Sequence, residues 1–474
     1  MKTIAIIGAG FSGTATAARL LTQPTSEPLR VVLINRSGEM ARGVAYGTQS
    51  PEHLLNVPAG NMSALAHDPD HFLRFCRSHD PAVTSGAFVS RRIYGQYLAR
   101  LLHDAESRPS QHNSLSRIVG EVIAVKTGPG PTEATLTLAG GARVGVDRVV
   151  FAFGHFPPRN VEISDQRFYS SSSYVRDPWS PDAAVRLAQS KRVLLLGTGL
   201  TAVDACLSLL NASSDRVIYA VSRRGLLPCT HRPSGPQPPS LDLSGRMEPI
   251  PATIRSYVHA IRREAQIRSQ RGEDWRNVLT AIRRTTPALW LRLSHAEKAR
   301  FLRHVQPYWE IHRHRAAPEP YERFQEMILS GALRIIAGRV VSLEEHADGV
   351  HATVRLRGTE QLSELQVDTV INCTGPSTDL KQLDDALIKQ LIMDGLILPD
   401  ALRLGIEVAD NYAVLDARGR PSSLLYYVGP LLRARYWEAT AVPELRVHAQ
   451  HLADQLLSSM AIGATPAAVE TSTS

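Results

Sequence analysis

Short apolar runs that end in glycine turns alternate with helical patterns along the chain. Residues 3–7 form one apolar run, followed by the turn GAGFSG and by TATAARLLTQ, whose small and apolar residues favour a helix. Residues 193–196 form another run, followed by GTGLTA and VDACLSLLNA. The pattern therefore predicts the order strand, glycine turn and helix twice in one chain.

The second half of each unit repeats as well. Gly120 opens GEVIAVKTG, and a later apolar run, RVVFAFGH, reaches its glycine at Gly154. Gly338 opens GRVVSLEEH, and the corresponding run TVINCTGP reaches Gly375. Alternating segments between them, such as ATLTLAGGARVGV and GVHATVRLRG, predict β-meanders. We therefore expect an α/β fold with two Rossmann-like dinucleotide-binding domains, β-meanders and a helical insertion.

The glycine turns carry the candidate chemistry. In such a turn the first glycine allows the tight bend, the second lets a pyrophosphate approach, and the third lets helix pack on strand. The N-terminus of the helix then offers free N–H groups to the anion. Glycines that serve packing alone are the alternative, but the flanking strand and helix favour two dinucleotide sites. The expected contacts are Gly8, Gly10 and Gly13 in the first unit, and Gly197, Gly199 and Ala202 in the second.

The strand ends distinguish the two dinucleotides. After the strand RVIYAV stand Ser222, Arg223 and Arg224, where an acidic residue usually contacts the ribose. Guanidinium groups pair with a 2′-phosphate, so this end predicts NADPH, with a solvated arginine pair as the alternative. The first unit is then expected to bind FAD. Its strand VVLIN ends at Asn35, a neutral group near Glu39 that can still bond a ribose hydroxyl, which predicts weaker FAD binding than usual.

These assignments set the expected domain limits. Residues 1–160 would form the first part of the FAD domain, and 161–366 the NADPH domain with a helical insertion at about 252–318. Residues 367–460 would return to the FAD domain. The small and polar residues of 461–474 predict a disordered tail.

Composition narrows the class of protein. With 474 residues, 43% of them hydrophobic and 21% charged, the chain is expected to fold into several domains rather than be disordered or fibrous. Its net charge of +8 suits anionic cofactors or carboxylates as well as nucleic acid. We find no apolar run of membrane-spanning length and no room for a secretory signal, and expect a cytoplasmic location. The absence of CxxC spacing predicts small buried thiols at Cys76, Cys206, Cys229 and Cys373 and argues against a disulfide reductase.

Several segments together resemble a known family. The segment Arg42–Phe75, the stretch FVSRRIYGQYL, the later WRNVLTAIRRTTPALWLRLS and YWEIHRHRAAPE, and the ending Gly429–Arg446 are similar to FAD/NAD(P)-binding oxidoreductases related to class B flavin-dependent monooxygenases. The likeness extends to about Gln455. One branch of that group N-oxygenates amino acids, and includes enzymes that convert aspartate to nitrosuccinate.

The resemblance implies particular site residues. Asn56, in LLNVPAGNMS, matches an asparagine beside the reactive edge of the flavin, and Met62 and Asp68 follow as they do in the family. A turn cap before Pro58 is the alternative for Asn56. Near the C-terminus, a helix with Glu444 in its first turn would direct N–H groups at the flavin pyrimidine, with an ordinary capped helix as the alternative. The cofactor contacts expected in these segments are Arg42, Asn56, Met62, Gly375, Gly429, Thr440, Ala441 and Val442.

The middle of the chain is the candidate substrate region. Residues 228–251 are too proline-rich for regular structure and would form either a cover over the nicotinamide or a linker. A helical block from Thr253 to about Val305 follows, with a capping box at Ser294 and Glu297. Its cations would mostly be solvated, with one or two in the run HRHR facing inward to bind carboxylates. The cations are Arg283, Arg284, Arg292, Arg300, Arg303, His304, His312, Arg313, His314 and Arg315, of which we assign His314 and Arg315 to the substrate.

Together these features predict an FAD-dependent, NADPH-using monooxygenase with O2 as co-substrate. It would N-oxygenate the amine of a small acidic amino acid such as aspartate through a C4a-hydroperoxyflavin, with Asn56 as the catalytic residue. Two alternatives stay open: an NADPH-dependent flavin oxidoreductase without oxygenation, and a non-catalytic nucleotide-sensing protein. We expect no metal site, because His312 and His314 lack a Cys or acidic partner at ligand spacing. Nucleic acid and membrane partners are not expected.

Overall fold

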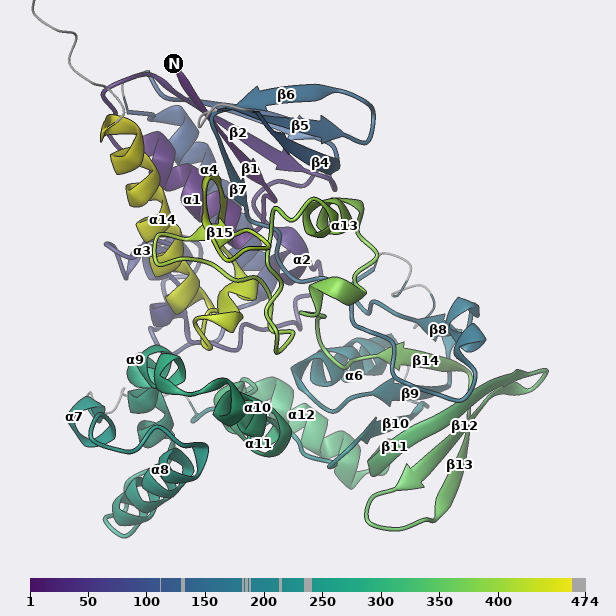
Figure 1. Ribbon diagram of the computed structural model, residues 1–474. Coiled ribbons are helices and arrows are strands. Elements are labelled where there is room, and N and C mark those ends of the chain that lie inside the picture. The colour runs from purple at the N-terminus through teal and green to yellow at the C-terminus, as the bar shows by residue number, and fades with distance from the viewer. Residues whose placement is uncertain are drawn as a thin grey trace, which may run out of the picture.

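Two separate sheets carry the two glycine turns of the repeat (Figure 1). The first lies at the top of Figure 1 and the second at the lower right, with the helices of the middle region at the lower left. The computed structural model describes residues 1–110, 112–128, 133–180, 183, 186, 189–212, 215–233 and 241–462. The expected disordered tail therefore lies outside the described residues from 463 onward, as do residues 234–240 of the proline-rich stretch.

The first sheet is parallel except at one edge, where β15 pairs antiparallel with β16. Its order is β15 (Ala413–Leu415), β16 (Pro421–Tyr427), β7 (Arg148–Phe151), β1 (Lys2–Ile7), β2 (Leu29–Asn35) and β3 (Ser114–Val119). A separate meander contains β4 (Val122–Thr127), β5 (Ala134–Leu138) and β6 (Arg143–Val146). The helices of this unit are α1 (Phe11–Thr22), α2 (Gly43–Tyr46), α3 (His71–His79), α4 (Arg91–Ser107), α13 (Ala386–Met393) and α14 (Val442–Ile462).

The second sheet corrects one expected boundary. Its order is β13 (Leu362–Val367), β12 (Gly349–Leu356), β11 (Leu333–His346), β10 (Val217–Ser222), β9 (Arg192–Leu196), β14 (Thr369–Asn372) and β8 (Tyr174–Val175). Because β14 pairs in parallel with β9, the second unit continues past residue 366, where we expected the chain to leave it. Helices α6 (Leu200–Ala212) and α12 (Pro318–Leu329) pack on this unit, with Phe324 fully buried in its core.

The two units repeat at the level of single hydrogen bonds. Gly8 N–H donates to Ile34 O at 2.9 Å, and Gly197 N–H donates to Val221 O at 2.8 Å. Both glycines have positive φ, +109° and +116°. A Cβ on Gly8 would lie 2.6 Å from the carbonyl oxygen of Ala152, which follows β7, and a Cβ on Gly197 would lie 2.6 Å from that of Cys373, which follows β14. The fold class predicted from the repeat is therefore confirmed.

The helical insertion packs on the returning C-terminal segment. Its helices are α7 (Ser244–Met247), α8 (Ile254–Ser269), α9 (Arg276–Arg292), α10 (His295–His304) and α11 (Gln306–Arg313). Trp290 donates its indole N–H to Ala434 O at 3.0 Å, and its ring lies 4.7 Å from that of Trp437. This packing places the insertion beside the first unit although it interrupts the second.

Three local expectations need correction. Helix α7 forms within the stretch that we considered too proline-rich for regular structure. Helix α14 runs to Ile462 and so includes the first two residues of the expected tail. Ser294 caps α10, but the Glu297 carboxylate accepts from Ile254 N–H at 2.7 Å instead of completing the capping box. None of the described helices is long and apolar enough to cross a membrane.

Candidate functional site

The first glycine turn leaves the N-terminus of α1 open to an anion. Gly10 occupies the N-cap position and no side chain caps the helix, so the N–H groups of its first turn remain available. Gly43 lies against Gly10, because a Cβ on Gly43 would be 3.1 Å from the Gly10 Cα. Arg42 precedes it, and its guanidinium makes no hydrogen bond or ion pair with a described residue. The predicted residues of this turn therefore lie together, and the N–H groups of the first turn of α1 and of the Arg42 side chain there bond no described residue.

The neutral strand end at Asn35 keeps an acceptor free. Its side-chain amide donates to Glu39 O at 2.6 Å and lies 2.9 Å from Ser37 Oγ. Both contacts use the NH2 group and close the loop after β2, which leaves Oδ1 able to accept from a ribose hydroxyl.

The second glycine turn is open where a pyrophosphate would approach. A Cβ on Gly199 would meet nothing within 4 Å, whereas Ala202 is fully buried and packs helix α6 on the sheet. Ser222 Oγ is tied to the turn, since it lies 2.9 Å from Thr198 Oγ1. Arg223 is exposed at the end of β10, and the Arg224 guanidinium lies 5.8 Å from the Tyr308 ring centroid.

The loop around Asn56 lies between the two units. Leu55 N–H donates to Val89 O and Ala59 N–H donates to Ala87 O, each at 2.9 Å, so the loop is held on both sides of Asn56. The Asn56 side chain is half-buried and makes no hydrogen bond with a described residue, which removes the support for a turn cap. Met62 is buried in the adjoining core and is 2% exposed.

Other contacts dock this loop on the second unit. Arg91, which donates to Leu54 O at 3.1 Å, forms an ion pair with Asp204 of α6 at 2.8 Å. His53 Nε2 lies 2.9 Å from Ser208 Oγ on the same helix. The pair of Glu52 with Arg323 adds a third link. These contacts fix the position of the Asn56 loop relative to the second glycine turn.

The returning segment reaches the same region. Gly429, with φ +147°, is required because a Cβ there would lie 2.7 Å from the Tyr427 hydroxyl. Thr440 and Ala441 lead into α14, which begins at Val442 as expected, and Leu445 N–H donates to Ala441 O at 2.9 Å. Gly375 follows β14 with φ +90° and open space around it.

Most cations of the insertion are solvated or paired, as expected. Arg283 pairs with Glu444 in the first turn of α14, and the His312 ring packs edge-on against Trp275. His314 Nε2 lies 2.9 Å from Glu310. Although burial opposes it, His314 and Arg433 together hold the pKa of Glu310 well below its usual range. The exposed cations are Arg284, Arg292, Arg300, Arg303 and His304.

Arg313 and Arg315 of the run HRHR face inward. Each is 9% exposed. Arg313 donates to Glu438, itself 2% exposed, at 2.7 Å, but its Nη2 is buried without a partner. Arg315 makes no hydrogen bond or ion pair with a described residue, and its Nε is also buried without a partner. The residue paired in our prediction with Arg315, His314, instead contacts Glu310.

Arg315 sits in a surplus of positive charge. Burial, followed by the nearby Arg313, Arg276 and Arg232, lowers the pKa of Arg315 to about 10. Asp274 pairs with Arg232 at 2.6 Å and with Arg276 at 3.3 Å. Asp274 and Glu438 thus leave two of the four guanidinium charges uncompensated. Such a site would bind an anion, and guanidinium groups pair with carboxylates and phosphates alike.

Sequence reasoning missed the segment that joins Asn56 to this cluster. His231 Nε2 lies 2.9 Å from Asn56 O, and His231 N–H donates to Ala316 O at 2.9 Å. Arg276 donates to Thr230 O at 3.0 Å. No pattern in the sequence indicated these contacts, because they join a loop to an insertion far along the chain.

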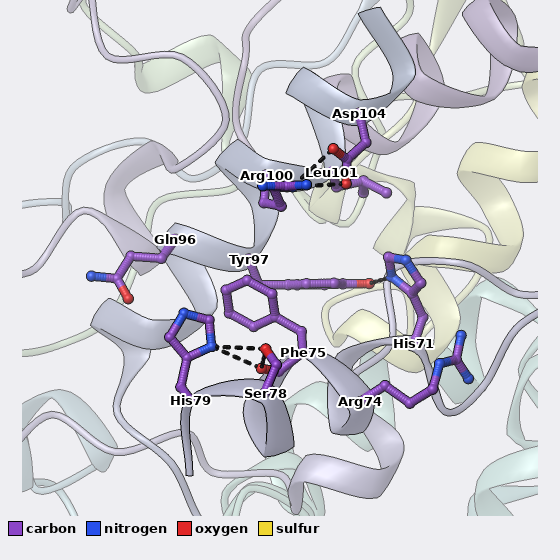
Figure 2. A pocket seen from close by; sticks show the side chains of 10 residues that line it. All are labelled: His71, Arg74, Phe75, Ser78, His79, Gln96, Tyr97, Arg100, Leu101 and Asp104. Atoms are coloured by element: carbon purple, nitrogen blue, oxygen red, sulfur yellow. Dashed lines mark hydrogen bonds and ion pairs between the residues drawn. The ribbon is translucent and has the colours of Figure 1, made fainter. Parts of the chain in front are cut away.

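A large cavity elsewhere does not belong to this site. It lies between α3 and α4, has a volume of about 800 Å³, and is shown in Figure 2. Arg100 pairs with Asp104, and Arg74 with Asp68, so its charges are balanced. The Tyr97 hydroxyl is bonded to His71 Nδ1 at 2.9 Å. Its charged side chains are therefore already paired, unlike Arg315.

The two sheets, each with a glycine turn after its central strand, define a fold of two dinucleotide-binding units. Residues 5–156 match the FAD-NAD(P)-binding family model. No curated protein matches the chain.

Solved structures share this fold over nearly the whole length of the chain. An ornithine N-hydroxylase from Kutzneria sp. 744 has a TM-score of 0.62 and 16% identity, with 97% of this chain and 99% of that chain covered. L-lysine 6-monooxygenase from Pseudomonas syringae has a TM-score of 0.63 and 15% identity, with 98% of this chain and 100% of that chain covered. The FAD-bound cadaverine monooxygenase of Erwinia amylovora has a TM-score of 0.65 and 11% identity, with 96% of this chain and 94% of that chain covered. The chain thus has the fold of FAD- and NADP-dependent N-hydroxylating monooxygenases, which confirms the resemblance at the level of fold.

Proposed function

We propose that the protein is an FAD-dependent, NADPH-using monooxygenase that N-oxygenates the amine of a small acidic amino acid such as aspartate. The observation that carries the proposal is Arg315, a buried arginine that makes no hydrogen bond or ion pair with a described residue, on a segment that is joined to the Asn56 loop through His231. The fold and the match to an FAD-NAD(P)-binding domain support the cofactors.

The residues present fit both dinucleotides. The uncapped N-terminus of α1, with Gly10 and Arg42, would hold the FAD pyrophosphate, and Asn35 would accept from its ribose. The open space at Gly199 suits the pyrophosphate of NADPH. The exposed Arg223, together with Arg224, would bind the 2′-phosphate.

The start of α14 would complete the flavin site. Thr440, Ala441 and Val442 would direct N–H groups at the flavin pyrimidine, where negative charge develops on reduction. When bound, FAD accepts hydride from NADPH and activates O2. The Asn56 amide, which no described residue engages, would bond the reacting edge of the cofactor.

In the overall reaction, one atom of O2 forms a new N–O bond to the substrate amine and the other leaves as water. NADPH supplies the hydride and solvent the proton, and the amine becomes a hydroxylamine. The nitrogen must be uncharged to attack, and Arg315 would hold the carboxylate while its charge disfavours an ammonium nearby. The enclosing protein keeps water from the reacting atoms.

The arginine surplus favours an anionic substrate over the basic amines named for the related structures. Cadaverine carries two ammonium groups and no carboxylate, so nothing in it would pair with Arg315, whereas lysine has one carboxylate and aspartate has two. A dicarboxylate would instead supply the partners that Arg313 Nη2 and Arg315 Nε lack.

A substrate panel tests this assignment. The FAD-loaded enzyme is supplied with NADPH, O2 and aspartate, glutamate, ornithine, lysine or cadaverine, and the N-oxygenated product formed per NADPH oxidised is measured. We expect the ratio to approach one with aspartate and stay near zero with cadaverine. Hydrogen peroxide as the sole product with every amine would support the flavin oxidoreductase instead, and failure of NADPH to reduce the flavin would support a nucleotide sensor.

A further inference from the structure

We propose that His231 is a positioning residue: from the second unit, its imidazole N–H holds the Asn56 backbone and thereby sets the Asn56 side chain at the flavin site. This inference rests on the proposed function for its catalytic consequence. The contact itself is a geometric feature of the folded chain, with His231 Nε2 lying 2.9 Å from Asn56 O.

The Asn56 carbonyl accepts one of the bonds that join the loop to the other unit, and it is the bond at Asn56 itself. The residues on either side, Leu55 and Ala59, donate to Val89 and Ala87 of their own unit. Between them Asn56 accepts from His231, which follows β10 in the second unit. The orientation of Asn56 therefore depends on where the second unit docks.

The imidazole is held in the state that this role requires. A carbonyl oxygen can only accept, so Nε2 must carry the proton and donate. Burial, followed by the nearby Arg315, lowers the pKa of His231 to about 3. The side chain is therefore neutral in the working range, with a fixed tautomer, and its ring packs 5.0 Å from that of Phe88.

Backbone hydrogen bonds hold His231 next to the segment that carries Arg315. Its N–H donates to Ala316 O, Ala316 N–H donates to Cys229 O, and Cys229 N–H donates to Ile311 O, each at 2.9 Å. Ala316 directly follows Arg315. The short ladder thus joins the Arg315 segment to Asn56 through a single side chain, and substrate binding at Arg315 and oxygen transfer beside Asn56 share one support.

Three substitutions separate the donor from the ring. In His231→Gln the amide nitrogen occupies a place close to Nε2, in His231→Asn it corresponds to Nδ1, and His231→Leu has no donor. We expect the product formed per NADPH to fall about fivefold in the Asn and Leu variants, the change expected from loss of one neutral hydrogen bond, and to return to within twofold of wild type in His231→Gln. NADPH-driven flavin reduction should change less than twofold in all three.

A second readout needs no cofactor. Hydrogen exchange of residues 54–59, measured in the FAD-free chain, should be faster in the Asn and Leu variants and close to wild type in His231→Gln. Wild-type exchange and wild-type coupling in His231→Leu would overturn the inference. Failure of the wild-type enzyme to oxygenate any amine would refute the proposed function, while the exchange measurement would still decide the role of His231.

Discussion

Replacing Arg315 by Met is expected to stabilise the substrate-free protein and weaken substrate binding. Arg315 is 9% exposed, and its guanidinium makes no hydrogen bond or ion pair with a described residue. Burial and the neighbouring arginines lower its pKa from 12.5 to about 10, which indicates a cost of keeping it charged in the fold. At about 1.36 kcal/mol per pKa unit, this cost is about 3 kcal/mol, taken as an upper bound.

The sign follows from the direction of the pKa shift. Because the pKa of Arg315 is lower in the folded than in the unfolded state, the charged form destabilises the fold at every pH below about 10. At pH 7.5 Arg315→Met removes this cost and keeps an apolar stem of similar length. The free energy of unfolding should rise by about 1–3 kcal/mol.

Urea denaturation of the FAD-loaded protein measures the first effect, and steady-state kinetics the second. Loss of a charge-assisted contact should raise the KM for aspartate about 10–100-fold. Arg284→Met, which removes an exposed cation of α9, is the matched control and should change neither quantity. A destabilised Arg315→Met protein with an unchanged KM would refute the reasoning, since it would mean that Arg315 is satisfied within the fold.

Three further predictions concern the cofactor sites. Replacing Arg223 and Arg224 together by Ser should lower the ratio of kcat/KM for NADPH to that for NADH by about 10–100-fold, and an unchanged ratio would contradict their role. Asn56→Ala should leave flavin reduction by NADPH intact but shift oxygen consumption from N-oxygenated product to hydrogen peroxide, measured as product per NADPH. Gly199→Ala should keep the wild-type Tm and raise the KM for NADPH, whereas Gly197→Ala should unfold the second unit, because its Cβ would lie 2.6 Å from a carbonyl oxygen.

The turns were predictable because a backbone requirement is written directly in residue type. Gly8 and Gly197 must adopt positive φ beside a neighbouring carbonyl, and few residues other than glycine can do so. The apolar runs next to them predict the strands for the same reason, since a buried parallel strand needs apolar residues on both faces. The whole framework of two dinucleotide folds follows from such local signals.

The substrate site was less predictable because it depends on where a helix ends. Helix α11 stops at Arg313, and the chain then extends through Arg315, so these two side chains turn inward while His314 between them meets Glu310. A helix continued by one turn would have placed them differently. Likewise, His231 is joined to Asn56 by tertiary packing that no local pattern records.

N-oxygenation by O2 is tested most directly by the source of the oxygen atom in the product. The FAD-loaded enzyme is supplied with NADPH, aspartate and ¹⁸O2, and the N-oxygenated product is analysed by mass spectrometry. A monooxygenase places one ¹⁸O atom in each N–O bond formed, and we expect this incorporation to match the NADPH oxidised. NADPH oxidation that yields labelled hydrogen peroxide and unmodified aspartate would contradict it.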